Sequence, residues 1–117
     1  VLPVLVQRNI GVLGMKPLAA GAAVREGVAT AEECLSYALS LPTSVVITGC
    51  DSVAIVEQAI RVWKSFTPKS PAEMAALRAR TAASNQNGLL ERYKTTIQFD
   101  GTVRNPHWLT TASVMTA

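Results

Sequence analysis

Two short apolar stretches with a helix signal between them indicate the fold class: Ile10 to Met15, which reads IGVLGM, and Ser44 to Thr48, which reads SVVIT. The first is almost entirely apolar, and the second contains three consecutive β-branched apolar residues. Runs of this kind are typical of strands that are buried on both faces of a parallel sheet. We therefore predict two buried strands, over residues 10–15 and 44–48.

The segment between the strands carries the signals of a helix. Thr30 and Glu33 have the spacing of a capping box, and apolar residues follow at helical intervals. Pro42 is expected to end this helix at Leu41. Residues 17–29 are rich in alanine and glycine and are expected to form a loop. A strand, a helix and a second strand in this order predict a βαβ unit with parallel strands.

A further helix is expected directly after the second strand. Asp51 or Ser52 would cap it, and it would run to about Phe66. Its inner face is expected to carry four apolar residues: Val53, Val56, Ile60 and Trp63. Both Trp63 and Phe66 are accordingly predicted to lie in the core.

The remaining segments complete the predicted order of elements. Residues 1–9 have the character of a helix end, and Ser70 and Glu73 form a second capping box for a helix that runs to Ala83. Residues 89–117 show weak periodicity and are expected to form an irregular tail. Two strands are too few for a parallel sheet with both faces covered. The chain is therefore expected to be part of a larger α/β domain.

Composition narrows the possible functions. The 117 residues are 49% hydrophobic and 16% charged, which excludes intrinsic disorder. The net charge of +3 comes from scattered Lys and Arg with acidic residues between them, so we expect no nucleic-acid binding. No apolar run reaches the length of a membrane span, about 18 residues, and we expect no membrane partner. One histidine and two cysteines without ligand spacing predict no metal site.

The beginning of the sequence bears on the type of protein and on its location. The chain opens at Val1 rather than at methionine, and the opening lacks the charged region and cleavage site of a signal peptide. We interpret the chain as a piece of a longer, cytoplasmic protein.

Four segments in order resemble the aldo/keto reductase family. Gly14 to Gly21, GMKPLAAG, resembles the loop after the seventh strand of that family, and residues 30–41 match the helix that follows it. Val45 to Ser52, VVITGCDS, resembles the eighth strand and the start of its helix. The tail from Tyr93 to Leu109 resembles the end of a bacterial branch of the family.

The resemblance implies a (β/α)8 TIM barrel, a fold that typically needs about 250 residues. Residues 1–117 would be a single partial domain: the end of helix 6, strand 7, helix 7, strand 8, helix 8 and the C-terminal tail. The family reduces aldehydes and ketones by hydride transfer from NADP or NAD, and its catalytic Asp, Tyr, Lys and His lie on earlier strands. This chain would therefore contain no catalytic residue and would be inactive alone. Its partners would be the nicotinamide cofactor, the carbonyl substrate and the remainder of the barrel.

The role that the resemblance implies for this part is cofactor binding. Loops after strands 7 and 8 of such barrels often bind phosphate beside a helix N-terminus. Lys16 would pair with a phosphate, and Gln58 matches a position near the adenine amine. The predicted cofactor-binding residues are Lys16, Leu18, Ala19, Ala20, Gly21, Gly49, Cys50, Asp51 and Gln58.

The chain departs from the family pattern where NADP would be selected. Members that prefer NADP usually carry Lys or Arg just after strand 8, to meet the 2′-phosphate, whereas residues 49–55 contain no cation. Asp51 would repel a phosphate and could instead accept a hydrogen bond from a 2′-hydroxyl. Both NADP and NAD therefore stay open as cofactors.

Two assignments have alternatives. The tail would either line the substrate mouth or pack as a strap outside the barrel, through residues such as Lys94, Arg104, His107 and Trp108. The whole chain could instead belong to a non-catalytic nucleotide-binding or regulatory relative of the barrel, or be a free-standing small α/β interaction module.

Overall fold

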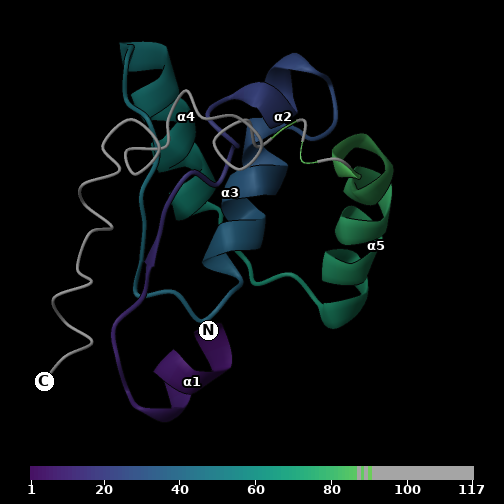
Figure 1. Ribbon diagram of the computed structural model, residues 1–117. Coiled ribbons are helices and arrows are strands. Elements are labelled where there is room, and N and C mark those ends of the chain that lie inside the picture. The colour runs from purple at the N-terminus through teal and green to yellow at the C-terminus, as the bar shows by residue number, and fades with distance from the viewer. Residues whose placement is uncertain (87, 89, 91–117) are drawn as a thin grey trace, which may run out of the picture.

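A computed structural model describes residues 1–86, 88 and 90 of the chain (Figure 1). The elements in this part are α1 (Leu2–Gln7), β1 (Leu13–Gly14), α2 (Ala22–Arg25), α3 (Ala31–Leu39), β2 (Val45–Val46), α4 (Val53–Lys64), α5 (Pro71–Ala82) and a 3-10 turn, η1 (Ala83–Asn85). Five α-helices and two parallel strands among the described residues make a mixed arrangement that is compatible with the α/β class.

The two strands lie side by side and run in the same direction, as predicted. Leu13 pairs with Val45 and Gly14 with Val46. Before the strands, the Val12 N–H donates to the Ser44 hydroxyl oxygen at 3.1 Å. Figure 1 shows that the chain leaves both strands toward the same side of the molecule, where α2 and the start of α4 lie. Each strand is shorter than its predicted range.

The capping box of α3 is confirmed. The Thr30 hydroxyl accepts from the Glu33 N–H at 3.1 Å, and the Glu33 carboxylate accepts from the Thr30 N–H at 2.9 Å. The helix ends at Leu39, two residues before the predicted Leu41. Its last turn is closed by the Thr43 hydroxyl, which donates to the Ala38 carbonyl at 3.0 Å.

The predicted capping box of α5 is also confirmed, between Ser70 and Glu73. Three polar contacts hold this helix region beside α3. The Lys69 N–H donates to the Ser40 hydroxyl at 2.9 Å. The Arg78 guanidinium donates to the Tyr37 hydroxyl at 3.3 Å, and Arg80 pairs with Glu33. As a result, α5 folds back along α3, as Figure 1 shows.

The cap of α5 gives a direct test of this local structure. Ser70→Ala removes the hydroxyl that accepts from the Glu73 N–H, and we expect it to lower the unfolding free energy by about 1 kcal/mol. Thr67→Ala, in the exposed segment between α4 and α5, is the matched control and is expected to change little. Urea unfolding followed by circular dichroism measures both. Equal midpoints for the two variants would contradict the cap.

Three predictions about the helices and the loop were wrong. A short helix, α2, lies within the predicted loop 17–29, because Gly21 takes a left-handed conformation (φ 80°) and its carbonyl accepts from the Arg25 N–H at 3.0 Å. Helix α4 ends at Lys64 rather than near Phe66. Its predicted inner face is largely exposed, with Val53 75%, Ile60 45% and Trp63 68% accessible.

The buried face of α4 is the one that carries Val62, which is 7% exposed, because α4 packs against α3 on that side. Trp63 is therefore not a core residue, while Phe66 is half-buried. The buried apolar residues of the described part are Ala23, Ala29, Ala31, Leu35, Val62 and Met74, and each keeps 6 to 8% of its surface exposed.

The strands are not buried on both faces, which is the fourth wrong prediction. Leu13 is 64% exposed, Met15 68% and Val45 51%. In the described part, β1 and β2 pair only with each other, so each strand keeps one edge without a neighbouring strand. Part of the apolar surface of these two stretches is therefore left uncovered by α3 and by the strands themselves.

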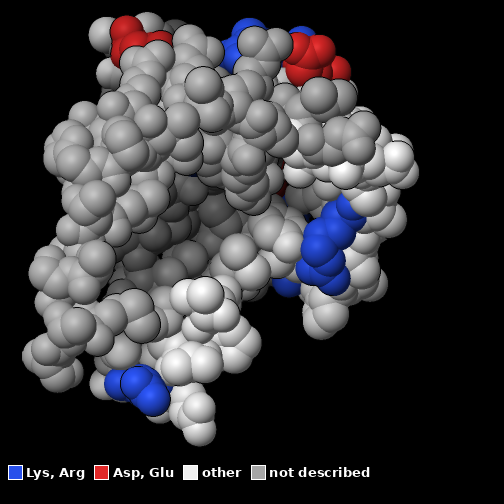
Figure 2. Space-filling model, viewed as in Figure 1, with Lys and Arg blue, Asp and Glu red and all other residues white. Residues whose placement is uncertain are grey.

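Two further expectations concern nucleic-acid binding and membrane-spanning helices. On the face in Figure 2, the described Lys and Arg side chains lie apart from one another rather than in one patch. No helix among residues 1–86 is long and apolar enough to cross a membrane. The expectations about nucleic acid and cytoplasmic location stay predictions.

Candidate functional site

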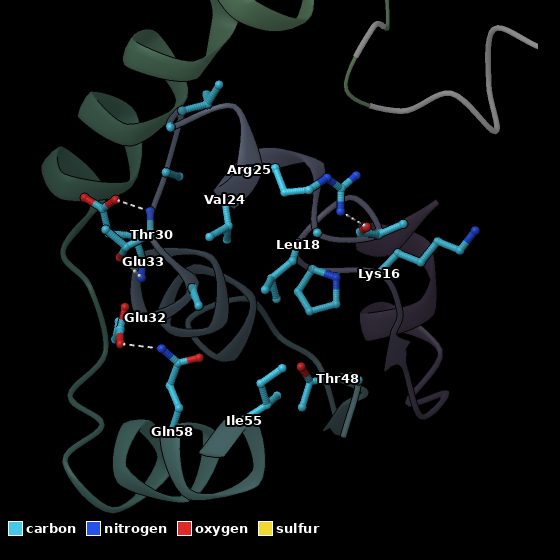
Figure 3. A pocket seen from close by; sticks show the side chains of 18 of the residues that line it. Lys16, Leu18, Val24, Arg25, Thr30, Glu32, Glu33, Thr48, Ile55 and Gln58 are labelled. Carbon is cyan, nitrogen blue, oxygen red and sulfur yellow. Dashed lines mark hydrogen bonds between the residues drawn. The ribbon is translucent and has the colours of Figure 1, made fainter. Parts of the chain in front are cut away.

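A cleft of about 1300 Å³ lies where the two strands end (Figure 3). Its walls come from the loop after β1, from α2, from the start of α3, from the loop after β2, from α4 and from the end of α5. Seven lining residues were predicted cofactor contacts: Lys16, Leu18, Ala20, Gly21, Gly49, Asp51 and Gln58. The other two, Ala19 and Cys50, belong to the same two loops but do not line it. That these residues bind a cofactor stays a prediction.

The loop after β1 has an unusual backbone. Lys16, Ala19, Ala20 and Gly21 all have positive φ, at 56°, 51°, 56° and 80°. The loop is closed by the Ala19 N–H, which donates to the Lys16 carbonyl at 3.0 Å. A left-handed conformation costs a non-glycine residue about 1 to 2 kcal/mol, and such strain gathers at functional sites.

Gly21 is the position in this loop where a side chain would be strained and would displace the end of the Arg25 side chain. Its φ of 80° suits glycine, and a Cβ there would lie 2.7 Å from a guanidinium nitrogen of Arg25. By contrast, a Cβ at Gly49 would meet no atom within 4 Å. The space above Gly49 is therefore left open by the described residues.

One end of the cleft is basic. Lys16 and Arg25 line it on the same side, as Figure 3 shows. The Arg25 guanidinium donates to the Ala20 carbonyl at 3.1 Å, which places it across the left-handed loop. Because a guanidinium carries five N–H donors, this contact leaves others for an anion. This end suits a phosphate or diphosphate group.

The opposite end of the cleft is acidic. The Glu32 carboxylate accepts from the Gln58 side-chain amide at 2.9 Å (Figure 3). The Glu33 carboxylate pairs with Arg80 at 2.6 Å. The pKa of Glu32 lies below its ordinary value, first because its own backbone N–H donates to the carboxylate and then because Gln58 does. The pKa of Glu33 is also lowered, first by the hydrogen bond from Arg80 and then by the one from Thr30. Both groups are therefore ionised at neutral pH.

The loop after β2 leads into α4. Ser52, rather than Asp51, is the N-cap, and its hydroxyl accepts from the Ile55 N–H at 3.3 Å. Asp51 is exposed and lines the cleft. Cys50 is exposed with a free thiol, which lies 3.9 Å from the Thr48 carbonyl oxygen. A thiol that faces its own loop and does not line the cleft gives no sign of a chemical role.

Sequence reasoning missed four charged residues of the cleft: Arg25, Glu32, Glu33 and Arg80. Arg25 was missed because α2 was taken for loop, and Arg80 because nothing local shows that α5 folds back beside α3. The sequence did contain a signal that could have placed Glu32 at the site. Glu32 lies in the first turn of α3, and the helix of a βαβ unit begins at the edge where the first strand ends.

The predictions for the tail, including Lys94, Arg104, His107 and Trp108, lie outside the described residues. Among residues 1–86, no group of three or more His, Cys, Asp or Glu side chains could hold a metal ion. Comparison of the chain with protein-family models, with curated proteins and with solved structures found no match. The resemblance to aldo/keto reductases therefore rests on the sequence motifs themselves.

Proposed function

We propose that this chain is the cofactor-binding C-terminal part of an NAD(P)H-dependent aldo/keto reductase, within a (β/α)8 barrel whose remaining strands would cover β1 and β2. The observation that carries the proposal is the cleft. Two segments that resemble the family's cofactor loops, separated along the chain by α3, meet at the ends of two parallel strands. In open and closed α/β sheets, ligands bind at the carboxyl ends of parallel strands.

Each end of the cleft has a role in this function. Lys16 and Arg25 would hold the diphosphate of the cofactor, and the left-handed loop would bring backbone groups of Leu18 to Gly21 close to it. Gln58 would accept from the adenine amine. The bound nicotinamide supplies the hydride that reduces an aldehyde or ketone. The residues of this chain bind and orient the cofactor, and a cytoplasmic location remains part of the proposal.

A second candidate is a nucleotide-binding relative that performs no reduction. It uses the same observation, because the charged residues that line the cleft would hold a nucleotide in either protein. The two candidates agree on binding and differ in what the rest of the protein does.

Binding to the full 117-residue chain tests the proposal. We expect NADH or NADPH to bind, with enhanced nicotinamide fluorescence, and Lys16→Met to weaken binding about tenfold through loss of one charged contact to the diphosphate. Lys64→Met, an exposed lysine at the end of α4 that does not line the cleft, is the matched control and should leave the Kd unchanged. The same chain should not oxidise the cofactor in the presence of a reactive aldehyde.

Two results would contradict the proposal. The first is the absence of binding for both cofactors at millimolar concentration. The second is equal weakening by Lys16→Met and Lys64→Met, which would mean that net charge rather than the cleft attracts the nucleotide. Aldehyde reduction by the chain alone at enzymatic rates would show that catalytic residues had been overlooked.

A further inference from the structure

We propose that the cleft selects a dinucleotide without a 2′-phosphate, NAD(H) over NADP(H), and that Glu32 is the residue that determines this preference. The inference rests on the proposed function, because it presumes that a nicotinamide dinucleotide occupies the cleft. It goes beyond that function in naming the cofactor and the selecting residue.

The orientation of the nucleotide follows from the opposite charges at the two ends of the cleft. The diphosphate is drawn to Lys16 and Arg25, so the adenosine lies toward Glu32 and Gln58. The hydrogen bond between these two residues also sets how Gln58 is turned. An ionised carboxylate can only accept, so the Gln58 amide must present its nitrogen to Glu32 at 2.9 Å. Its carbonyl oxygen is then left to accept from the adenine amine.

The Glu32 carboxylate holds its charge and its position. It is the acceptor of the Gln58 bond, and it sits in the first turn of α3, where the helix dipole favours an anion. The pKa of Glu32 is lowered, so the carboxylate is ionised at the pH at which a 2′-phosphate is doubly charged. A fixed anion in this wall repels a phosphate, whereas it can accept a hydrogen bond from a ribose hydroxyl.

Among the described residues, one cation lines this end of the cleft, and it is already paired. Arg80 lines the cleft, but it pairs with Glu33 at 2.6 Å, so its charge is offset there. Arg61, whose charge helps to lower the pKa of Glu32, does not line the cleft. Asp51, in the loop after β2, adds a further carboxylate to the lining. The lining residues contributed by the loop after β2 and by α4 include no Lys or Arg.

The experiment compares the Kd of NADH and NADPH for the full chain, by fluorescence and by calorimetry, at low salt. We expect NADH to bind about tenfold more tightly, the effect of one unfavourable charge pair across a solvated cleft. Glu32→Gln should reduce the ratio to about two, mainly by tightening NADPH, since a glutamine oxygen still accepts from Gln58. Asp51→Asn should also reduce the ratio of the NADPH and NADH Kd values. Glu26→Gln, which removes an exposed carboxylate that does not line the cleft, is the matched control and should leave the ratio unchanged.

Salt gives a readout that does not depend on any variant. The NADH preference of the unchanged chain should shrink between 0.05 and 0.5 M NaCl, because added ions screen the repulsion. Equal or tighter binding of NADPH by the unchanged chain overturns the inference while leaving the proposed function in place. If Arg80→Gln then removes that NADPH binding, the 2′-phosphate has displaced Glu33 from Arg80. The inference is also overturned if Glu32→Gln leaves the ratio of the NADPH and NADH Kd values unchanged. Failure of both cofactors to bind overturns the proposed function itself.

Discussion

Replacement of Leu35 by alanine is expected to lower the free energy of unfolding by about 2 to 5 kcal/mol. Leu35 is 6% exposed and lies on α3, the helix that contacts both α4 and β2. The other buried residues of the described part include three alanines, whose side chains are too short to fill the space that the substitution leaves. A typical domain has a total stability of about 5 to 15 kcal/mol, so a loss of this size removes much of it.

The matched control for this prediction is Leu13→Ala. It removes the same atoms from a side chain that is 64% exposed, and it is expected to cost less than about 1 kcal/mol. Urea unfolding at low micromolar concentration, followed by far-ultraviolet circular dichroism, compares the two. If Leu13→Ala is as destabilising as Leu35→Ala, the strand face that carries Leu13 is covered in solution.

At concentrations in the tens of micromolar, the chain is expected to sediment as species larger than a monomer. Leu13, Met15 and Val45 are all more than half exposed, and β1 and β2 each present an edge without a neighbouring strand in the described part. Exposed strand edges pair readily with other chains. Each exposed Val or Leu also forgoes about 1.5 to 3 kcal/mol of burial. Pairing of strands between copies would therefore stabilise dimers or larger assemblies.

A charged residue on the strand should interfere with this association. Leu13→Lys is expected to shift the distribution toward monomer in sedimentation velocity, because lysine on an edge strand disfavours pairing. Gln7→Lys adds the same charge on the exposed surface of α1 and should leave the distribution unchanged. A homogeneous monomer of the unchanged chain at these concentrations would speak against an incomplete sheet and in favour of a free-standing module.

Local signals in the sequence were sufficient for the order of the elements apart from α2, which was taken for a loop. The capping boxes at Thr30 and Ser70 placed the starts of α3 and α5 because a cap depends on residues only three positions apart. The β-branched run at Val45 and Val46 located β2, and a helix between two such runs implied the parallel pairing that is observed. The motif residues that were expected to share a site do lie around one cleft, apart from Ala19 and Cys50.

The faces of the elements and the charges of the site depended on the tertiary structure. Helix α4 has apolar residues on more than one side, so its pattern could not show that α3 covers Val62 and leaves Trp63 exposed. Glu32 and Gln58 are 26 residues apart, and only the packing of α3 against α4 brings them within a hydrogen bond. Likewise, Arg80 reaches Glu33 because α5 folds back beside α3. Periodicity and caps report on neighbours along the chain, whereas the electrostatics of a cleft come from side chains that meet only after helices pack.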